Sequence, residues 1–232
     1  DIILSFAQVF LNLKDITLLM VEIGSKYKIG TRRFGLINWI GAWALYKKEC
    51  LRFLIVWAQT IFSPLISALL FLLVLSVAIG NERGDVLGVS FINFLAPGLI
   101  AMQVIQQSFS HSSSSFMIGK IQGNIVDILY APLSAAEVTF SVTLAAVTRS
   151  VIIAFVSIVT FYFIIDFEIK NYFTLIAFTF LSSFILGALG MIAGLWAEKF
   201  DHMATATNFI IVPLSFLSGT FYSIDKLPSY LQ

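Results

Sequence analysis

Few residues in this sequence could carry out chemistry, and they do not form a catalytic set. A Gly-Lys pair at 119–120 in "SFMIGKIQ" could end a phosphate-binding loop, but Ser114 replaces the first glycine of that motif and Ile121 follows the lysine. His111 and His202 stand alone, without the clustered His, Cys or carboxylate residues that hold a metal. We therefore expect no enzymatic activity, no metal, and no ATP site or other cofactor site in this polypeptide.

The polar segment "KIQGNIVDILYAPLSAAEV" (120–138) separates two long apolar runs and is too long for a tight turn. Drawn as a helix, it has an isoleucine stripe and a polar stripe, and Pro132 ends the pattern. The apolar stripe is Ile118, Ile121, Ile125 and Ile128; the polar stripe is Lys120, Asn124 and Asp127, with Gln122 and Tyr130 in the same predicted helix. One face could rest on the rest of the protein while the other meets a soluble partner. The alternative is a surface loop that only connects its neighbours.

One charged side chain, Arg149, stands deep within an apolar run. An unpaired charge near the centre of a bilayer costs at least about 2.5–3.5 kcal/mol on insertion scales. We therefore expect Arg149 to reach the headgroup region, to pair with another group, or to face a polar cavity. A structural role and contact with an anionic head group or carboxylate both stay open.

Proline and glycine residues inside the apolar runs are further candidates. Pro64, Pro97 and Pro213 could each produce a kink that forms a hinge or the wall of a cavity, and tolerated kinks are the alternative. Gly190 and Gly194 have the G-x-x-x-G spacing that allows two helices to approach closely. We expect this glycine pair to serve packing within the chain first and contact with a second copy only after that.

The composition is that of an integral membrane protein. Hydrophobic residues make up 59% of the chain and charged residues 12%, which is more apolar and less charged than an ordinary soluble domain. Backbone polar groups in lipid must be satisfied internally, and the apolar runs are continuous rather than alternating, so helices are expected. Each run reaches the roughly 20 residues that a membrane-spanning helix needs. The predicted spans are 53–80, 91–110, 136–165, 172–197 and 203–222.

The fold class predicted from these runs is all-α, a polytopic membrane helix bundle. The residues 1–23 carry polar side chains at three- and four-residue steps, which is typical of a helix lying in the membrane interface. The residues 36–52 contain two tryptophans four apart and then "KKECLR", which predicts an elbow helix leading into the first span. A poorly ordered terminus is the alternative for residues 1–34.

The distribution of Lys and Arg predicts the orientation. Most of these residues precede the first predicted span, and the positive-inside rule then places the N-terminus in the cytoplasm. The N-terminal bases are Lys14, Lys26, Lys28, Arg32, Arg33, Lys47, Lys48 and Arg52. The loops at 111–135 and 198–202 would also be cytoplasmic. Cys50 is the single cysteine, so no internal disulfide can form, and a net charge of +1 gives no reason to expect a nucleic-acid partner.

Several stretches of the chain carry a family resemblance. They are "WAQTIFSPLI", "GDVLGVSFINFLAPGLIAM", "SSSFMIGKIQGNIVDILYAPLS", the arginine of the third span, "AEKFDHM" and "SGTFYSIDKLP". In this order they resemble the permease subunits of ABC-2 type exporters, most closely the simple inner-membrane permeases of Gram-negative bacteria. The resemblance covers residues 35–232 and is specific to the family, not to a substrate, whereas residues 1–34 match it less clearly.

The resemblance implies a subunit of an ATP-driven exporter of the bacterial inner membrane. Such a permease has six spans, forms a homodimer among membrane lipids, and binds a separate ABC ATPase subunit that holds the ATP. It would export an amphipathic, lipid-linked or drug-like molecule. Its coupling helix, which docks on the ATPase, would be about Ile118–Tyr130. Five spans are present here, and the sixth is expected beyond residue 232. The alternative function is a non-transporting membrane scaffold or assembly factor, for which the same spans would suffice.

Overall fold

The structure is a computed structural model that describes residues 35, 37–79, 88–165, 171–217 and 220–221. All of its described helices belong to one unit, Asn38–Gln232. The segment 1–34, predicted to lie in the membrane interface, is outside the described residues.

Every regular element among the described residues is a helix, as the all-α prediction requires. In chain order the elements are α2 (Trp39–Ile55), α3 (Trp57–Ile79), α4 (Phe91–Ile121), α5 (Ile125–Tyr130), α6 (Ala135–Ile164), α7 (Tyr172–Trp196), α8 (Phe200–Ala206), the π-helix η1 (Thr207–Ile211) and α9 (Val212–Leu217). Helices therefore occupy most of each predicted span among the described residues. The first span, expected to begin at residue 53, is divided at Val56, and the described helical part of the last ends at Leu217.

Three of the described helices are long and apolar enough to cross a membrane: Trp57–Ala78 in α3, Ala135–Ile164 in α6 and Tyr172–Trp196 in α7. The sequence of α4 is long but interrupted by glutamine and serine residues, which lower its mean hydropathy. The segment that continues from α8 through η1 to α9 is divided by a π-helical turn just before Pro213. Membrane crossing by α4 and by the α8–α9 segment remains a prediction.

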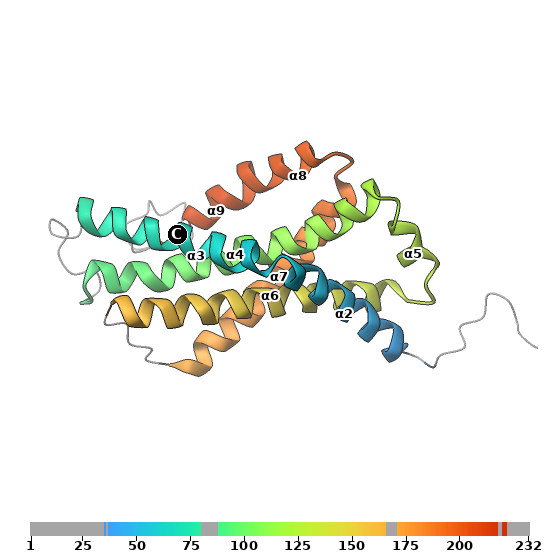
Figure 1. The fold of residues 1–232 in the computed structure, drawn as a ribbon, viewed down its shortest axis with the longest axis horizontal. Coiled ribbons are helices and arrows are strands. Elements are labelled where there is room, and N and C mark those ends of the chain that lie inside the picture. Colours follow the sequence, from blue (N-terminus) through green and yellow to red (C-terminus); the bar gives the residue numbers. More distant parts are fainter. Residues whose placement is uncertain (1–34, 36, 80–87, 166–170, 218–219, 222–232) are drawn as a thin grey trace, which may run out of the picture. The chain divides into compact units, whose positions relative to one another are not determined.

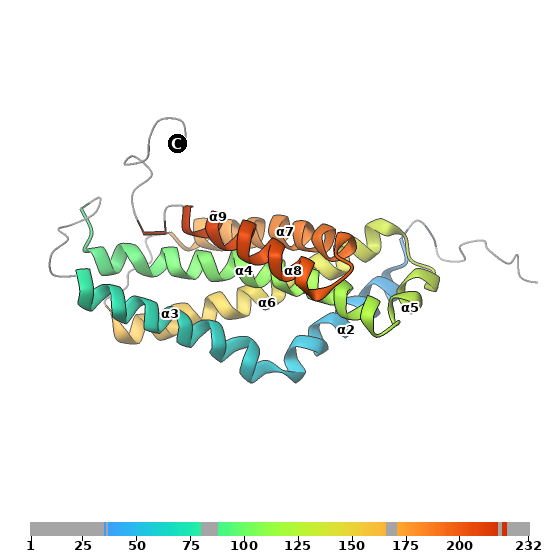
Figure 2. The same cartoon turned by 90° about the horizontal axis from the view of Figure 1, so that it is seen from above.

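Helix α4 is the centre of the packing. It contacts α6 and α7 extensively, and α6 and α7 also contact each other. Figures 1 and 2 show these three long helices side by side, with α3 along one flank of α4 and α2 crossing α6. The chain turns sharply between α2 and α3 at Val56, where the backbone leaves helical geometry, and Figure 2 shows the resulting angle between these two helices.

The starts of α2 and α6 are joined through one carboxylate. Ser134 and Glu137 form a capping box at the start of α6, because each side chain accepts a hydrogen bond from the other's backbone N–H. The second oxygen of Glu137 accepts a hydrogen bond from the backbone N–H of Asn38, the N-cap of α2. The Asn38 amide also donates to the Pro132 carbonyl at 3.2 Å. The base of α2, the loop before α6 and the start of α6 therefore form one bonded unit.

Two buried hydrophobic clusters hold the bundle together, one on each side of a polar middle. The first cluster consists of Ala68, Leu72, Phe91, Leu95, Ala96, Leu99, Ile100, Val104, Ala154 and Phe161, from α3, α4 and α6. The second cluster consists of Leu45, Phe116 and Val142, from α2, α4 and α6, with Met191 of α7 packed against it. Because lipid tails are as apolar as these side chains, the clusters stabilise the bundle through close van der Waals packing, which fixes the positions of the polar groups between them.

Candidate functional site

Buried polar side chains fill the bundle between the two hydrophobic clusters. This polar layer consists of Gln103, Ser108, His111, Ser112, Ser113, Ser115, Thr143, Ser150 and Ser157 of α4 and α6. The Ser108 and Ser150 hydroxyls lie 2.6 Å apart, and Ser157 donates to the Gln103 amide oxygen at 3.0 Å. Buried polar groups need such partners because an unmatched one costs about 1–3 kcal/mol.

A buried carboxylate, Glu49 of α2, reaches into this layer. Glu49 is 1% exposed and accepts hydrogen bonds from Arg52 Nε at 3.0 Å and from Ser115 Oγ at 2.7 Å. Arg52 extends across to α4, where its Nη2 donates to the His111 carbonyl at 2.9 Å. His111 is completely buried, with its ring against the edge of Phe53 and its Nε2 3.8 Å from the Glu49 carboxylate. The charged pair of α2 is therefore bonded directly to the backbone and side chains of α4.

Arg149 of α6 turns inward to α4. Its Nη2 donates to the Gln107 amide oxygen at 2.6 Å. Its Nε atom is buried and has no hydrogen-bond partner among the described residues. Among those residues, the ion pair of the bundle interior joins Glu49 to Arg52, the His111 ring lies near the same carboxylate, and Arg149 forms no ion pair. Of the placements expected for this side chain, pairing with a neutral polar group inside the bundle is the one observed.

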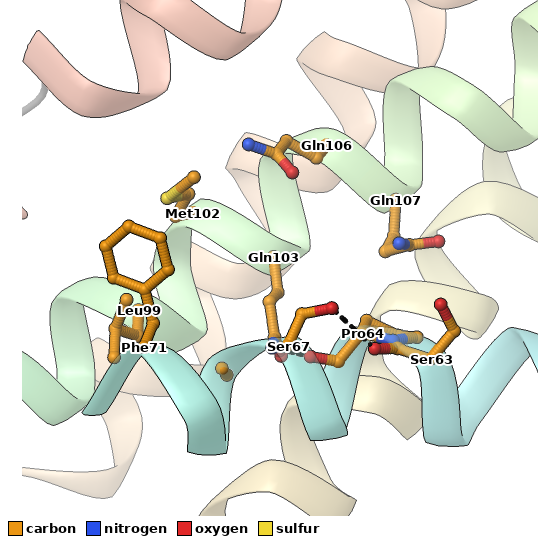
Figure 3. A pocket seen from close by; sticks show the side chains of 10 residues that line it. Ser63, Pro64, Ser67, Phe71, Leu99, Met102, Gln103, Gln106 and Gln107 are labelled. Carbon is orange, nitrogen blue, oxygen red and sulfur yellow. Dashed lines mark hydrogen bonds between the residues drawn. The ribbon is translucent and has the colours of Figure 1, made fainter. Parts of the chain in front are cut away.

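A pocket of about 180 Å³ lies between α3 and α4, next to Gln107. It is lined by Ser63, Pro64, Ser67, Ala68, Phe71, Leu99, Met102, Gln103, Gln106 and Gln107. Figure 3 shows Phe71, Leu99 and Met102 gathered at one end and Ser63 and Gln107 at the other. The pocket therefore has an apolar end and a polar end.

The predicted coupling segment forms two helices instead of one. Helix α4 continues to Ile121, and α5 begins at Ile125 after a turn in which Gly123 has a φ of 76°. A positive φ favours glycine because other side chains are strained there. The turn changes the helical phase, so Ile121 is exposed while Ile125 and Ile128 pack against the second cluster. The continuous isoleucine stripe drawn over 118–130 is therefore interrupted.

The polar residues of this segment also separate. The ammonium group of Lys120 donates to the carbonyls of Leu195 and Ala197, where it caps the C-terminal end of α7. Asn124 donates to the side chain of Gln122 at 3.2 Å on the exposed turn. Asp127 is exposed on α5.

The outward surface of α5 is largely apolar. Tyr130 is 87% exposed and Leu129 is 74% exposed, and Val126 is also exposed. Figure 1 shows α5 at one end of the bundle, beyond the end of α4. The face of α5 that is open to a partner therefore combines one carboxylate, Asp127, with an aromatic ring and two aliphatic side chains.

Comparison with known proteins matches residues 41–232 to the family described as ABC-2 type transporter. The chain belongs to this family. The inner membrane transport permease YadH of Escherichia coli strain K12 is 30% identical over 197 residues, which cover 84% of this chain and 77% of YadH. Nodulation protein J of Neorhizobium galegae is 25% identical over 203 residues, which cover 85% of this chain and 75% of that protein. No solved structure matches the chain significantly.

The ABC-2 family consists of membrane-embedded, multi-pass permease subunits of ABC transporters, in which the ATPase is a separate subunit. This chain is accordingly a transport permease. The resemblance given by the sequence motifs is thereby confirmed at the level of the family.

The glycines of α7 lie against α4 within the permease. A Cβ atom at Gly190 would be 2.3 Å from the Phe109 carbonyl oxygen, and one at Gly194 would be 2.7 Å from the Ser113 carbonyl oxygen. The G-x-x-x-G spacing therefore serves packing inside this chain. Pro97 lies within α4 on an exposed face and is outside the lining of the α3–α4 pocket.

The sequence pattern does not predict that Glu49, Arg52 and the glutamines of α4 form buried or partly buried polar contacts inside the bundle. The pattern around "KKECLR" predicts only an elbow helix, and His111 stands alone in the sequence. One signal was available: Gln103, Gln106 and Gln107 recur at three- and four-residue steps inside a predicted span, where polar side chains are costly.

Proposed function

We propose that this permease is the membrane-spanning part of an ATP-driven exporter of the bacterial inner membrane, moving an amphipathic or lipid-linked molecule. It would act as a homodimer with an ABC ATPase bound on the cytoplasmic side, where its own N-terminus would also lie. The observation that carries the proposal is the construction of α5, whose outer face is exposed while Ile125 and Ile128 pack on the second cluster.

The packing of α5 gives a route for mechanical work. The second cluster joins side chains of α2, α4 and α6, with Met191 of α7 beside it, so a displacement of α5 would act on four helices together. Protein interiors are densely packed and transmit such displacements rather than absorbing them. A partner ATPase that holds Asp127 and Tyr130 could therefore drive the whole bundle through Ile125 and Ile128.

The first prediction tests docking on α5. Asp127→Lys reverses an exposed charge without changing the packed isoleucines, so we expect normal membrane levels with reduced ATPase co-purification and reduced export. Loss of a charge-assisted contact weakens binding by roughly ten- to a hundred-fold, or about 1.5–3 kcal/mol. Co-purification of the ATPase from solubilised membranes measures this.

A second variant and a control sharpen the docking test. Gly123→Pro should have the same effect, because proline cannot adopt the positive φ of the turn before α5. Glu198→Lys makes the same charge reversal on an exposed residue outside α5 and should leave ATPase binding unchanged. Full ATPase binding and export in both Asp127→Lys and Gly123→Pro would show that the segment is only a connector, and would favour the scaffold function.

The second prediction tests orientation in the membrane. In a Cys50→Ser background, a cysteine at Gln122 should be protected from an impermeant thiol reagent added to intact cells. Cysteines at Gly84 and Lys170, which lie outside the described residues, should react. Reaction at Gln122 in sealed cells would reverse the proposed topology and remove α5 from the ATPase side.

A further inference from the structure

Among the described residues, the polar layer carries more positive than negative charge, whereas the buried Glu137 lies outside this layer at the start of α6. Its described charged side chains are the buried Glu49 and the partly buried Arg52 and Arg149, which give one negative and two positive charges. Glu49 accepts hydrogen bonds from Arg52 and Ser115, whereas Arg149 donates to the neutral amide of Gln107 among the described residues. A partly buried cation with a neutral partner keeps much of its attraction for an anion, since screening by water is reduced at such a position.

Gln107 connects this charge with the α3–α4 pocket. Its amide oxygen is occupied by Arg149 Nη2 at 2.6 Å, while its side chain also lines the pocket. An amide that accepts through its oxygen presents its NH₂ group as a donor. The hydroxyl of Ser63 lies at the same polar end (Figure 3). Among the lining residues none is acidic, so the polar end offers hydrogen-bond donors under the field of a cation.

The remaining wall of the pocket suits a hydrocarbon group. Phe71, Leu99 and Met102 form the other end, and Phe71 is 43% exposed, so this end is open to the surroundings of the bundle. A volume of about 180 Å³ holds a small head group or a short part of a chain, and not a whole lipid. A chain attached to a bound head group would therefore continue outward past Phe71.

We propose that the α3–α4 pocket binds the anionic head group of an amphiphile, with Gln107 donating to the anion, Arg149 supplying the charge behind it, and Phe71, Leu99 and Met102 contacting the first part of the chain. This inference rests on the proposed export function and names its substrate class. Arg149 is a positioning residue in this arrangement, because it holds Gln107 and lies outside the pocket lining.

The test is a binding measurement on the full permease purified with its ATPase in nonionic detergent. Three probes are compared: lysophosphatidic acid, a monoacylglycerol with the same chain, and inorganic phosphate. We expect lysophosphatidic acid to bind at least about tenfold more tightly than either of the others, because only it fills both ends of the pocket. Equal affinity for the two lipids, or for inorganic phosphate and lysophosphatidic acid, would overturn the proposal.

Variants test whether the preference for lysophosphatidic acid over monoacylglycerol arises in this pocket. Gln107→Leu should reduce the affinity for lysophosphatidic acid by about five- to tenfold and leave that for monoacylglycerol unchanged. Arg149→Met should abolish the preference, and Arg149→Lys should retain part of it. Gln59→Leu makes the same change on an exposed position of α3 outside the pocket and serves as the matched control.

The outcomes separate this site from the function on which it rests. An unchanged preference in Gln107→Leu would overturn the site even if Arg149→Met failed to fold. Such a result, with Asp127→Lys still impairing export, would leave the exporter function standing and remove the anion site alone. Conversely, a preference lost in Gln107→Leu and kept in Gln59→Leu supports the site independently of ATPase docking.

Discussion

Replacing Gly190 with valine is expected to remove most folded permease from the membrane. A Cβ atom at this position would lie 2.3 Å from the carbonyl oxygen of Phe109, and the obstacle is backbone of α4 rather than a movable side chain. Helix α4 is held by α6 and α7 together, so it can withdraw only by opening the bundle. We expect a loss of about 3 kcal/mol in the free energy of unfolding, at the upper end for overpacked cores. Size-exclusion profiles and thermal unfolding midpoints in detergent measure it.

A matched glycine substitution controls for the effect of adding a side chain to a helix. At Gly119, near the end of α4, the nearest atom to an added Cβ atom is 3.8 Å away, on Ile125. Gly119→Ala should therefore leave the unfolding midpoint unchanged or raise it slightly, since alanine is favoured over glycine in helices by about 0.5–1 kcal/mol. A Gly190→Val protein as stable as Gly119→Ala would mean that α4 and α7 do not approach closely.

Removing the carboxylate of Glu49 is the second change with a large expected effect. Glu49→Leu leaves Arg52 without its charged partner and Ser115 without its acceptor in the interior of the bundle. Breaking one side of a fully buried ion pair costs about 3–5 kcal/mol. Because Arg52 is 28% exposed and keeps its hydrogen bond to the His111 carbonyl, we expect a cost of about 2–3 kcal/mol here. We expect a matching loss of thermal stability in detergent, and the same change at the exposed Glu198 should have no effect.

The double variant Glu49→Leu with Arg52→Met distinguishes the lost pair from a general packing defect. Because the unpaired cation is removed as well, the double variant should be more stable than Glu49→Leu alone. A double variant that is as unstable as the sum of the two single variants would show that the pair does not act as a unit.

The sequence predicts the long helices well where their ends carry local signals. The span expected at 136–165 is Ala135–Ile164 in the structure, and its start coincides with the Ser134–Glu137 capping box. The span expected at 172–197 is Tyr172–Trp196, which begins after the N-cap Asn171. Continuous apolar runs with such caps leave few alternatives.

Other features depend on the tertiary fold and could not be read from the pattern. The direction in which the side chains of α5 point depends on the left-handed conformation of Gly123. Periodicity alone predicts a single continuous helix through that position. Glu49 stands in a run of charged residues that is typical of a solvated face, yet it is buried because α4 presents Ser115 to it. The α3–α4 pocket depends on how α3 packs against α4 beside Gln107, which the pattern of neither helix alone determines.

The carboxylate of Glu137 connects the starts of α2 and α6 rigidly, because it accepts hydrogen bonds from both. It binds the N-cap residues of α2 and α6 at the same time, and Asn38 adds a bond to the loop between α5 and α6. Amphipathic helices at a membrane surface follow the lateral pressure and curvature of the lipid around them. A tilt of α2 in the bilayer would therefore also move the start of α6, because the two helix starts are bonded directly through Glu137. If α2 lies in the membrane interface and α5 receives the ATPase, as proposed, bilayer tension and the displacement of α5 would act on the same helix, and the transport rate would then depend on membrane composition.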